Sequence, residues 1–167
     1  MNMSVATTYA KLSVISITVT AIITSVHHIY REGWGLLIPA ALIVVLPFVL
    51  MRWFGASGSN IALSAYGLLN ALIIVGLGIV DGFLDHVVNA VITLYAATSG
   101  EAVDRLDRAF RVLPQTPLVG DVLYELTGIL TFIASMIAAY YWYRFMRVAL
   151  ARRMGGPRDV NPVVSQA

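Results

Sequence analysis

Two aspartates and a histidine interrupt an otherwise apolar run, the stretch GLGIVDGFLDHVVNA at residues 76–90. Asp81, Asp85 and His86 stand where a membrane helix would normally carry leucine or valine. A carboxylate at the edge of the hydrocarbon is costly unless it is paired, solvated or bound to a metal. Imidazole and carboxylate together suit zinc, copper(II), manganese or non-haem iron. These residues are therefore candidates for a metal site.

The other two histidines, His27 and His28, end the first apolar run, and Glu125 begins the last one. At about 1.5 Å per residue, each of these helices reaches the same outer membrane level at its ionisable residues. We therefore predict one metal site in a four-helix bundle at its outer face. The candidate metal ligands are His27, His28, Asp81, Asp85, His86 and Glu125.

Helix geometry limits which candidates can bind together. Asp81 and Asp85 share a face of an ideal helix, whereas His86 is turned by about 100° from Asp85. One aspartate would then bind the metal with His86, and the other would orient a ligand or face solvent. His27 and His28 have the same limit. The metal could be copper, zinc or iron, with a redox or metal-handling role. No nucleophile or cofactor motif is visible, so the sequence assigns no reaction.

Three other interpretations use the same residues. The polar residues could form a solvated helix end in which they hydrogen-bond one another and Arg31. His27 or His28 could pair with His86 as axial ligands of a b-type haem in a membrane anchor. The chain could also be an accessory structural subunit of a larger membrane complex, bound to other membrane proteins or to a second copy of itself.

Composition establishes the class of protein that positions these residues. Of 167 residues, 59% are hydrophobic and 12% charged, and the mean hydropathy is +0.80. A soluble domain of this length has too small a core to bury so much apolar surface, so the lipid bilayer must be part of the solvent. The absence of cysteine excludes disulfides and thiolate metal sites. A formal charge of +2, without a basic face, argues against nucleic-acid binding.

The apolar segments predict an all-α, four-helix transmembrane bundle. The expected spans are residues 9–26 or slightly beyond, 35–51, 61–80 with a less apolar continuation to 97, and 122–143, each near the ~20 residues that cross a bilayer. No proline interrupts residues 61–97, so we expect one long helix that protrudes, tilts or kinks, most plausibly near Gly82. Gly78 and Gly82 have the spacing that lets membrane helices pack closely.

Basic residues predict the orientation of the bundle. With four crossings, one side carries Lys11, Arg52, Arg144, Arg147, Arg152, Arg153 and Arg158, whereas the arginines of the other side are matched by acids. The positive-inside rule then places both termini in the cytoplasm. Residues 98–113 predict a short amphipathic extracytoplasmic helix between spans three and four, since acid–arginine pairs four apart accompany an apolar stripe. We expect one membrane domain over residues 1–148 and a flexible basic cytoplasmic tail over 149–167.

Three short motifs resemble those of a group of small bacterial four-span membrane proteins. The motifs are HHIY at residues 27–30, DGFLDH at 81–86 and ELTG at 125–128. The resemblance implies a bacterial inner (cytoplasmic) membrane location, and it carries no activity. It points to the residues His27, His28, Tyr30, Asp81, Gly82, His86, Glu125, Thr127 and Gly128.

The orientation is testable by cysteine labelling, since the chain has no cysteine of its own. A cysteine placed at Gly100 should react with a membrane-impermeant thiol reagent added from outside, and one placed at Ser165 should react only after the membrane is opened. The reverse pattern would place the termini outside.

Overall fold

The computed structural model describes residues 3–92, 95 and 122–154, and all the described elements are helical. The first helix is α1, Met3–Glu32. A short 3-10 turn, η1 at Trp34–Leu36, leads into α2, Leu37–Ser57. The third helix combines α3, Asn60–Leu72, with the π-helical segment η2, Ile73–Val88. The last is α6, Val122–Met154. The predicted all-α class is confirmed, and four described helices are long and apolar enough to cross a membrane.

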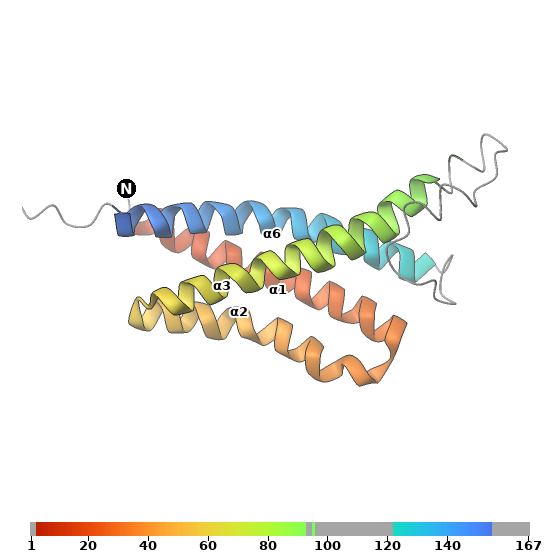
Figure 1. Ribbon diagram of the computed structural model, residues 1–167, viewed down its shortest axis with the longest axis horizontal. Coiled ribbons are helices and arrows are strands. Elements are labelled where there is room, and N and C mark those ends of the chain that lie inside the picture. The colour runs from red at the N-terminus through yellow and green to blue at the C-terminus, as the bar shows by residue number, and fades with distance from the viewer. Residues whose placement is uncertain (1–2, 93–94, 96–121, 155–167) are drawn as a thin grey trace, which may run out of the picture.

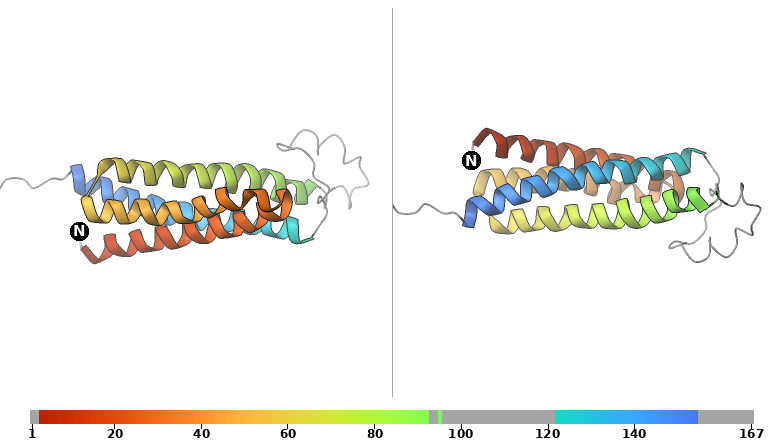
Figure 2. Two further views of the ribbon diagram at one scale, coloured as in Figure 1. Left: turned by 90° about the horizontal axis from the view of Figure 1, so that it is seen from below. Right: turned by 90° about the horizontal axis from the view of Figure 1, so that it is seen from above.

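The helices form an elongated bundle in which α6 is the central packing partner (Figure 1). α1 and η2 both pack mainly against α6, and α2 packs against α1 and α3. Two further views show the same lengthwise arrangement (Figure 2). The start of α1, the α2–α3 turn and the end of α6 lie at one end of the bundle (Figure 1). We call the opposite end, which contains Gly33, Val88 and Val122, the site end. The first and last described helices therefore have their outer termini on the same side.

Local sequence signals explain where α2 and α3 begin and end. Gly33 and Gly58 have φ angles of 88° and 63°, which residues with a Cβ rarely adopt. Gly58 follows α2, and its N–H donates to the Phe54 carbonyl at 2.8 Å, a typical glycine C-cap. Ser59 then caps α3, because its side-chain oxygen accepts a hydrogen bond from the Ala62 N–H at 3.3 Å. Glycine and serine thus permit a tight turn between two long helices.

The third helix is continuous from Asn60 to Ile92, as expected for the part of the predicted segment that is described. Its departure from α geometry begins at Ile73, well before Gly82. In π-helical bonding, residues five apart are joined, so a turn holds more than four residues. The buried residues of η2 are Ile73, Ile74, Gly78, Asp81, Gly82 and His86. This wider turn places Asp81 and His86, five positions apart, among the buried side chains of one helix.

Small polar side chains fill the interface between α1 and α6. Thr20, Thr24 and Thr131 are fully buried. The Thr20 hydroxyl donates to the Ser16 carbonyl at 3.0 Å, and the Thr131 hydroxyl donates to the Thr127 carbonyl at 3.0 Å. Bonds of this kind to the residue's own helix satisfy the hydroxyl without water, so such residues can be buried within a membrane. Small interface residues also let the two helices approach closely.

Glycines bring η2 equally close to α6. A Cβ at Gly78 would overlap the Ser135 side chain. A Cβ at Gly82 would lie 2.9 Å from the Phe132 backbone nitrogen and 3.0 Å from the Gly128 carbonyl oxygen. The prediction that Gly78 and Gly82 serve close packing is confirmed.

The last helix extends to Met154, beyond residue 148 where the membrane domain was predicted to end. Arg153 explains part of this extension, because it donates to the Gly58 carbonyl at 2.8 Å and lies over the Phe54 ring. Positive charge in the last helical turn is also favourable for the helix dipole. The rest of the predicted tail, residues 155–167, and the predicted amphipathic helix at 98–113 lie outside the described residues.

Close approach at Gly82 leads to a stability prediction. Gly82→Ala should destabilise the detergent-solubilised protein by ~1–3 kcal/mol, because the new methyl group meets backbone atoms of α6 that cannot move aside. Thermal unfolding followed by circular dichroism measures the change. Gly76→Ala is the matched control, since a Cβ there has no neighbouring atom within 4 Å. Equal melting temperatures for the two variants would contradict the described packing.

Candidate metal centre

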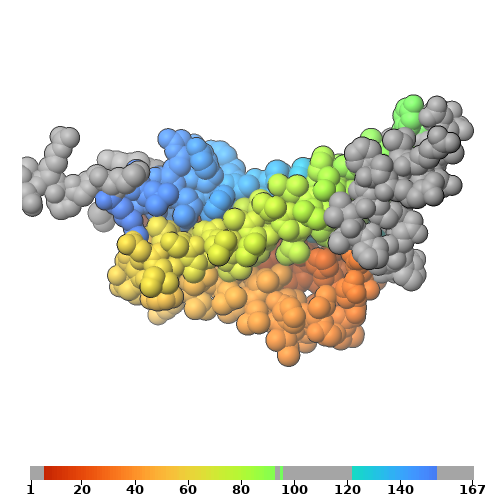
Figure 3. Space-filling view, in the orientation of Figure 1, coloured from red at the N-terminus to blue at the C-terminus, as the bar shows by residue number. Residues whose placement is uncertain are grey.

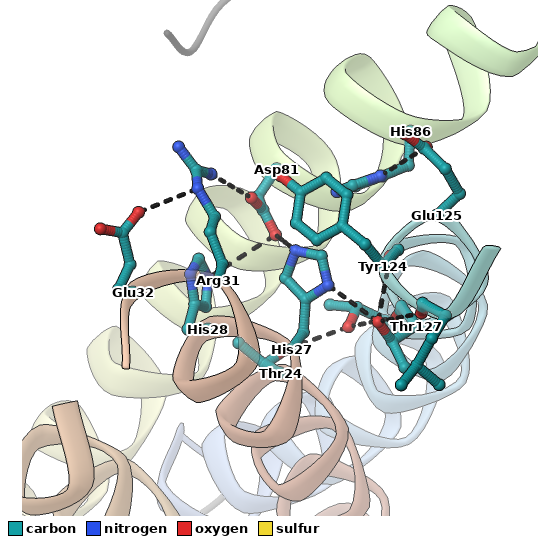
Figure 4. Close-up of polar contacts among 12 residues, drawn as sticks. Thr24, His27, His28, Arg31, Glu32, Asp81, His86, Tyr124, Glu125 and Thr127 are labelled. Carbon is teal, nitrogen blue, oxygen red and sulfur yellow. Dashed lines mark hydrogen bonds and ion pairs between the residues drawn. The ribbon is translucent and has the colours of Figure 1, made fainter. Parts of the chain in front are cut away.

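Three ionisable side chains converge between α1, η2 and α6 near the site end (Figure 4). They are His27 of α1 and Asp81 and His86 of η2, and each offers one ligand atom within 4.8 Å of the others. All three are buried, with exposed fractions of 0%, 2% and 1%. The depth calculation from the sequence predicted that separate helices bring their ionisable residues to one level, and this convergence agrees with it.

A threonine of α6 orients the His27 ring. The Thr127 hydroxyl donates its only proton to the backbone of its own helix, lying 2.8 Å from the Leu123 carbonyl and 3.0 Å from the Tyr124 carbonyl. Its oxygen, 2.9 Å from His27 Nδ1, therefore acts as the acceptor, and His27 Nδ1–H donates to it. In the neutral ring this leaves a lone pair on Nε2. His27 Nε2 is buried and has no hydrogen-bond partner among the described residues.

A carboxylate of α6 orients the His86 ring in the same way. Glu125 Oε2 lies 2.9 Å from His86 Nδ1, and an ionised carboxylate only accepts hydrogen bonds. His86 Nδ1–H is then the donor, and the lone pair is again on Nε2, which is buried and has no partner in the described part of the chain. Gly128 makes space for the ring, because a Cβ at this position would overlap it. A histidine held by a carboxylate at one nitrogen, with the other free, is the usual arrangement of a metal-binding histidine.

Asp81 lies among positively charged or neutral nitrogen groups without a direct hydrogen bond. Its Oδ2 is 3.8 Å from His27 Nε2 and 3.6 Å from His28 Nε2, and its Oδ1 is 3.8 Å from a guanidinium nitrogen of Arg31. Within the described structure neither carboxylate oxygen has a hydrogen-bond partner. The Arg31 side chain is only 8% exposed and is also paired with Glu32 at 2.9 Å. Arg31 thus holds one oxygen of Asp81 and leaves the other directed at the imidazoles.

Tyr124 forms a wall of the centre. Its ring stacks on His27 with centroids 4.6 Å apart and packs against His86 at 4.7 Å. The two imidazoles themselves meet edge to face, with centroids 4.8 Å apart and planes at 89°. These contacts limit rotation of both rings.

Axial haem ligands must face each other across a porphyrin, and rings in direct contact leave no space for one.

The structure gives the predicted ligands different positions. His27, Asp81 and His86 form the group. Glu125 is not in the group and contacts His86 at Nδ1. His28 approaches Asp81 from the rim and is not in the group. Asp85 is partly buried and also lies outside it.

Sequence reasoning gave no role to several contacting residues. The resemblance named Thr127 and Gly128 without a role, and Arg31 entered only as a partner in a solvated helix end. Tyr124 carried no signal, because one more aromatic residue in an apolar helix is common.

Comparison of the chain with protein families, with curated proteins and with solved structures found no match. Function must therefore be inferred from the geometry and chemistry of this site.

The contact between Glu125 and His86 leads to a binding prediction. Glu125→Gln keeps the size of the side chain and removes its charge, so the orientation and basicity of His86 should suffer. We expect about 10–100-fold weaker binding of a divalent metal ion, with unchanged stoichiometry at saturation. Competition with a chelator of known affinity measures this. Glu32→Gln, which removes an acid that contacts Arg31 and is 49% exposed, should have a smaller effect. Equal effects would indicate that only overall charge matters.

Proposed function

We propose that this protein is an integral membrane metal-binding protein whose ion is held by His27 Nε2, a carboxylate oxygen of Asp81 and His86 Nε2. One observation carries the proposal: His27, Asp81 and His86 each offer a ligand atom within 4.8 Å of the others, and in the described structure the buried Nε2 atoms and the Asp81 oxygens have no hydrogen-bond partner. Buried polar atoms rarely lack a partner in proteins, so we expect a bound species to contact these atoms.

The distances support an ion better than a hydrogen-bond network. Ligand atoms that each lie about 2.1 Å from one zinc ion are about 3.4 Å apart at the tetrahedral angle. His27 Nε2 and Asp81 Oδ2 are 3.8 Å apart, too far for a hydrogen bond and close to this value. His27 Nε2 and His86 Nε2 carry lone pairs and no protons, so neither can donate a hydrogen bond to the Asp81 carboxylate. Small rotations of the side chains would bring all three atoms onto one cation.

Charge also supports a divalent cation. The carboxylates of Asp81 and Glu125 bracket the group, one at its centre and one behind His86. A negative charge requires compensation where it is buried, as at Asp81, which is 2% exposed. Arg31 supplies a single positive charge and shares it with Glu32. A divalent ion bound between neutral imidazoles would balance Asp81 and Glu125.

The donor set favours an open metal site over a closed structural one. Three protein ligands leave at least one coordination position for water or a small molecule, as in catalytic zinc sites. Two histidines and one carboxylate also form the donor set of mononuclear non-haem iron(II) centres. Iron or zinc therefore fits this set best, and copper rests only on its higher general affinity for such ligands. We infer a redox or metal-handling role, which the predicted orientation places at the outer membrane face.

The proposal is tested by the metal content of the purified protein and of two histidine variants. Elemental analysis and a visible spectrum of the wild type should show about one divalent ion per chain and no Soret band. His86→Ala should abolish stoichiometric metal, because it removes one of three ligands. His28→Ala, a change of the same type outside the group, should retain it at equilibrium.

Two outcomes would contradict the proposal. If the His86→Ala protein keeps its full metal content, the ion lies elsewhere. If the wild type binds no metal when purified or after exposure to iron(II) or zinc, the group is a polar cluster and the accessory-subunit interpretation gains support.

A further inference from the structure

His28 is placed beside the centre without belonging to it. Its Nε2 lies 3.6 Å from Asp81 Oδ2, the same oxygen that His27 approaches at 3.8 Å from the other side. The His28 and His27 rings meet edge to face with centroids 5.3 Å apart. His28 Nε2 is a buried atom with no hydrogen-bond partner in the residues described. His28 and Asp81 therefore form a second pair of ligand atoms that shares one carboxylate oxygen with the first.

Exposure distinguishes His28 from the three proposed ligands. The side chain of His28 is 22% exposed, whereas those of His27, Asp81 and His86 are 0–3% exposed. His28 also lies about one turn before Glu32, the last residue of α1, whose side chain is 49% exposed. His28 is thus the ligand-capable neighbour that reaches both the aqueous end and the buried carboxylate (Figure 4).

Among the described residues, packing and existing contacts close the approaches to the centre from α6. α6 lies against His86 so closely that Gly128 has no room for a Cβ. Tyr124 covers both imidazoles. Glu125 is also partly exposed, at 23%, but its carboxylate is hydrogen-bonded to the far nitrogen of His86 and not to the ligand side. Between α1 and η2, by contrast, the two helices contact each other little, and in the space-filling view the red surface of α1 is set back beneath the green surface of η2 (Figure 3).

We propose that His28 and Asp81 form an acquisition position for a divalent metal ion, from which the ion passes to the buried centre. The ion first binds His28 Nε2 and Asp81 Oδ2 and retains water in its other positions. His27 Nε2 and then His86 Nε2 replace His28 and water, while Asp81 stays bound throughout. The exchange changes neither the charge of the ion nor any covalent bond. This inference rests on the metal-binding function proposed above.

Asp81 Oδ2 belongs to both the acquisition position and the buried centre, so the ion can pass between them while it stays bound to this atom. A hydrated ion gives up water reluctantly, and each protein ligand that is already in place lowers that cost. Because Oδ2 faces His28 on one side and His27 on the other, the ion can move inward without being released by the carboxylate. Movement inward adds a ligand, so the buried position is the more stable one.

The experiment follows the rate and the end point of loading separately. Metal-free full-length protein in detergent is mixed with cobalt(II) chloride, and the visible absorption of bound cobalt is recorded in a stopped-flow instrument. His28→Gln should load about tenfold or more slowly, an effect comparable to losing a supporting partner of a metal ligand. Its final cobalt stoichiometry and the shape of its spectrum should equal those of the wild type. Glu32→Gln controls for charge at the same helix end and should load at close to the wild-type rate.

The possible outcomes separate this inference from the proposed function. Unchanged loading of His28→Gln overturns the acquisition position and leaves the buried centre intact. If His28→Gln loses stoichiometric cobalt or changes its spectrum as His27→Gln does, His28 is a permanent ligand and the inference is wrong. If the wild type binds no cobalt, zinc or iron(II), the metal-binding function fails, and this inference fails with it.

Discussion

The burial of the Asp81 carboxylate is the constraint on which the rest of the site depends. A carboxylate with 2% exposure, inside a helix that is otherwise apolar, is expensive to ionise unless its charge is compensated. Nitrogen atoms approach it at 3.6–3.8 Å from His27, His28 and Arg31, and none of them hydrogen-bonds to it. Arg31 compensates this carboxylate only in part, because it is also paired with Glu32. Buried ionisable groups of this kind are common at functional sites.

Different helices supply the group of His27, Asp81 and His86 and the residues that orient its rings. The ligand atoms come from α1 and η2, which contact each other little, and both pack mainly on α6. α6 contributes no atom to the group, but it supplies the hydroxyl of Thr127 for His27 and the carboxylate of Glu125 for His86. The orientation of both rings is therefore determined by one rigid helix. Gly82 and Gly128 allow this arrangement, because side chains there would separate η2 from α6.

Much of the fold follows from the sequence because lipid imposes simple requirements. Apolar length predicts the spans, and equal depth on separate helices predicts the level at which His27, Asp81 and His86 meet. The depth of a residue in the membrane does not, however, determine the rotation of its helix about the helix axis. Ideal α geometry left open which of Asp81 and Asp85 accompanies His86, and only the wider turns of η2 select Asp81. The contact of Glu125 with His86 Nδ1 could not be predicted from depth either, since a metal ligand and the residue that supports it lie at the same depth.

Rigidity and access place opposite demands on a site of this kind. Tyr124, Thr127 and Glu125 restrict the two imidazoles, which would lower the entropy cost of binding the proposed ion. The same contacts close the site on the side of α6. Among the described helices, α1 and η2 contact each other least, and His28 lies on this side of Asp81. Two adjacent histidines on one helix thus have different surroundings: His27 is fully buried against Tyr124, whereas His28 is 22% exposed, as the proposed acquisition position requires.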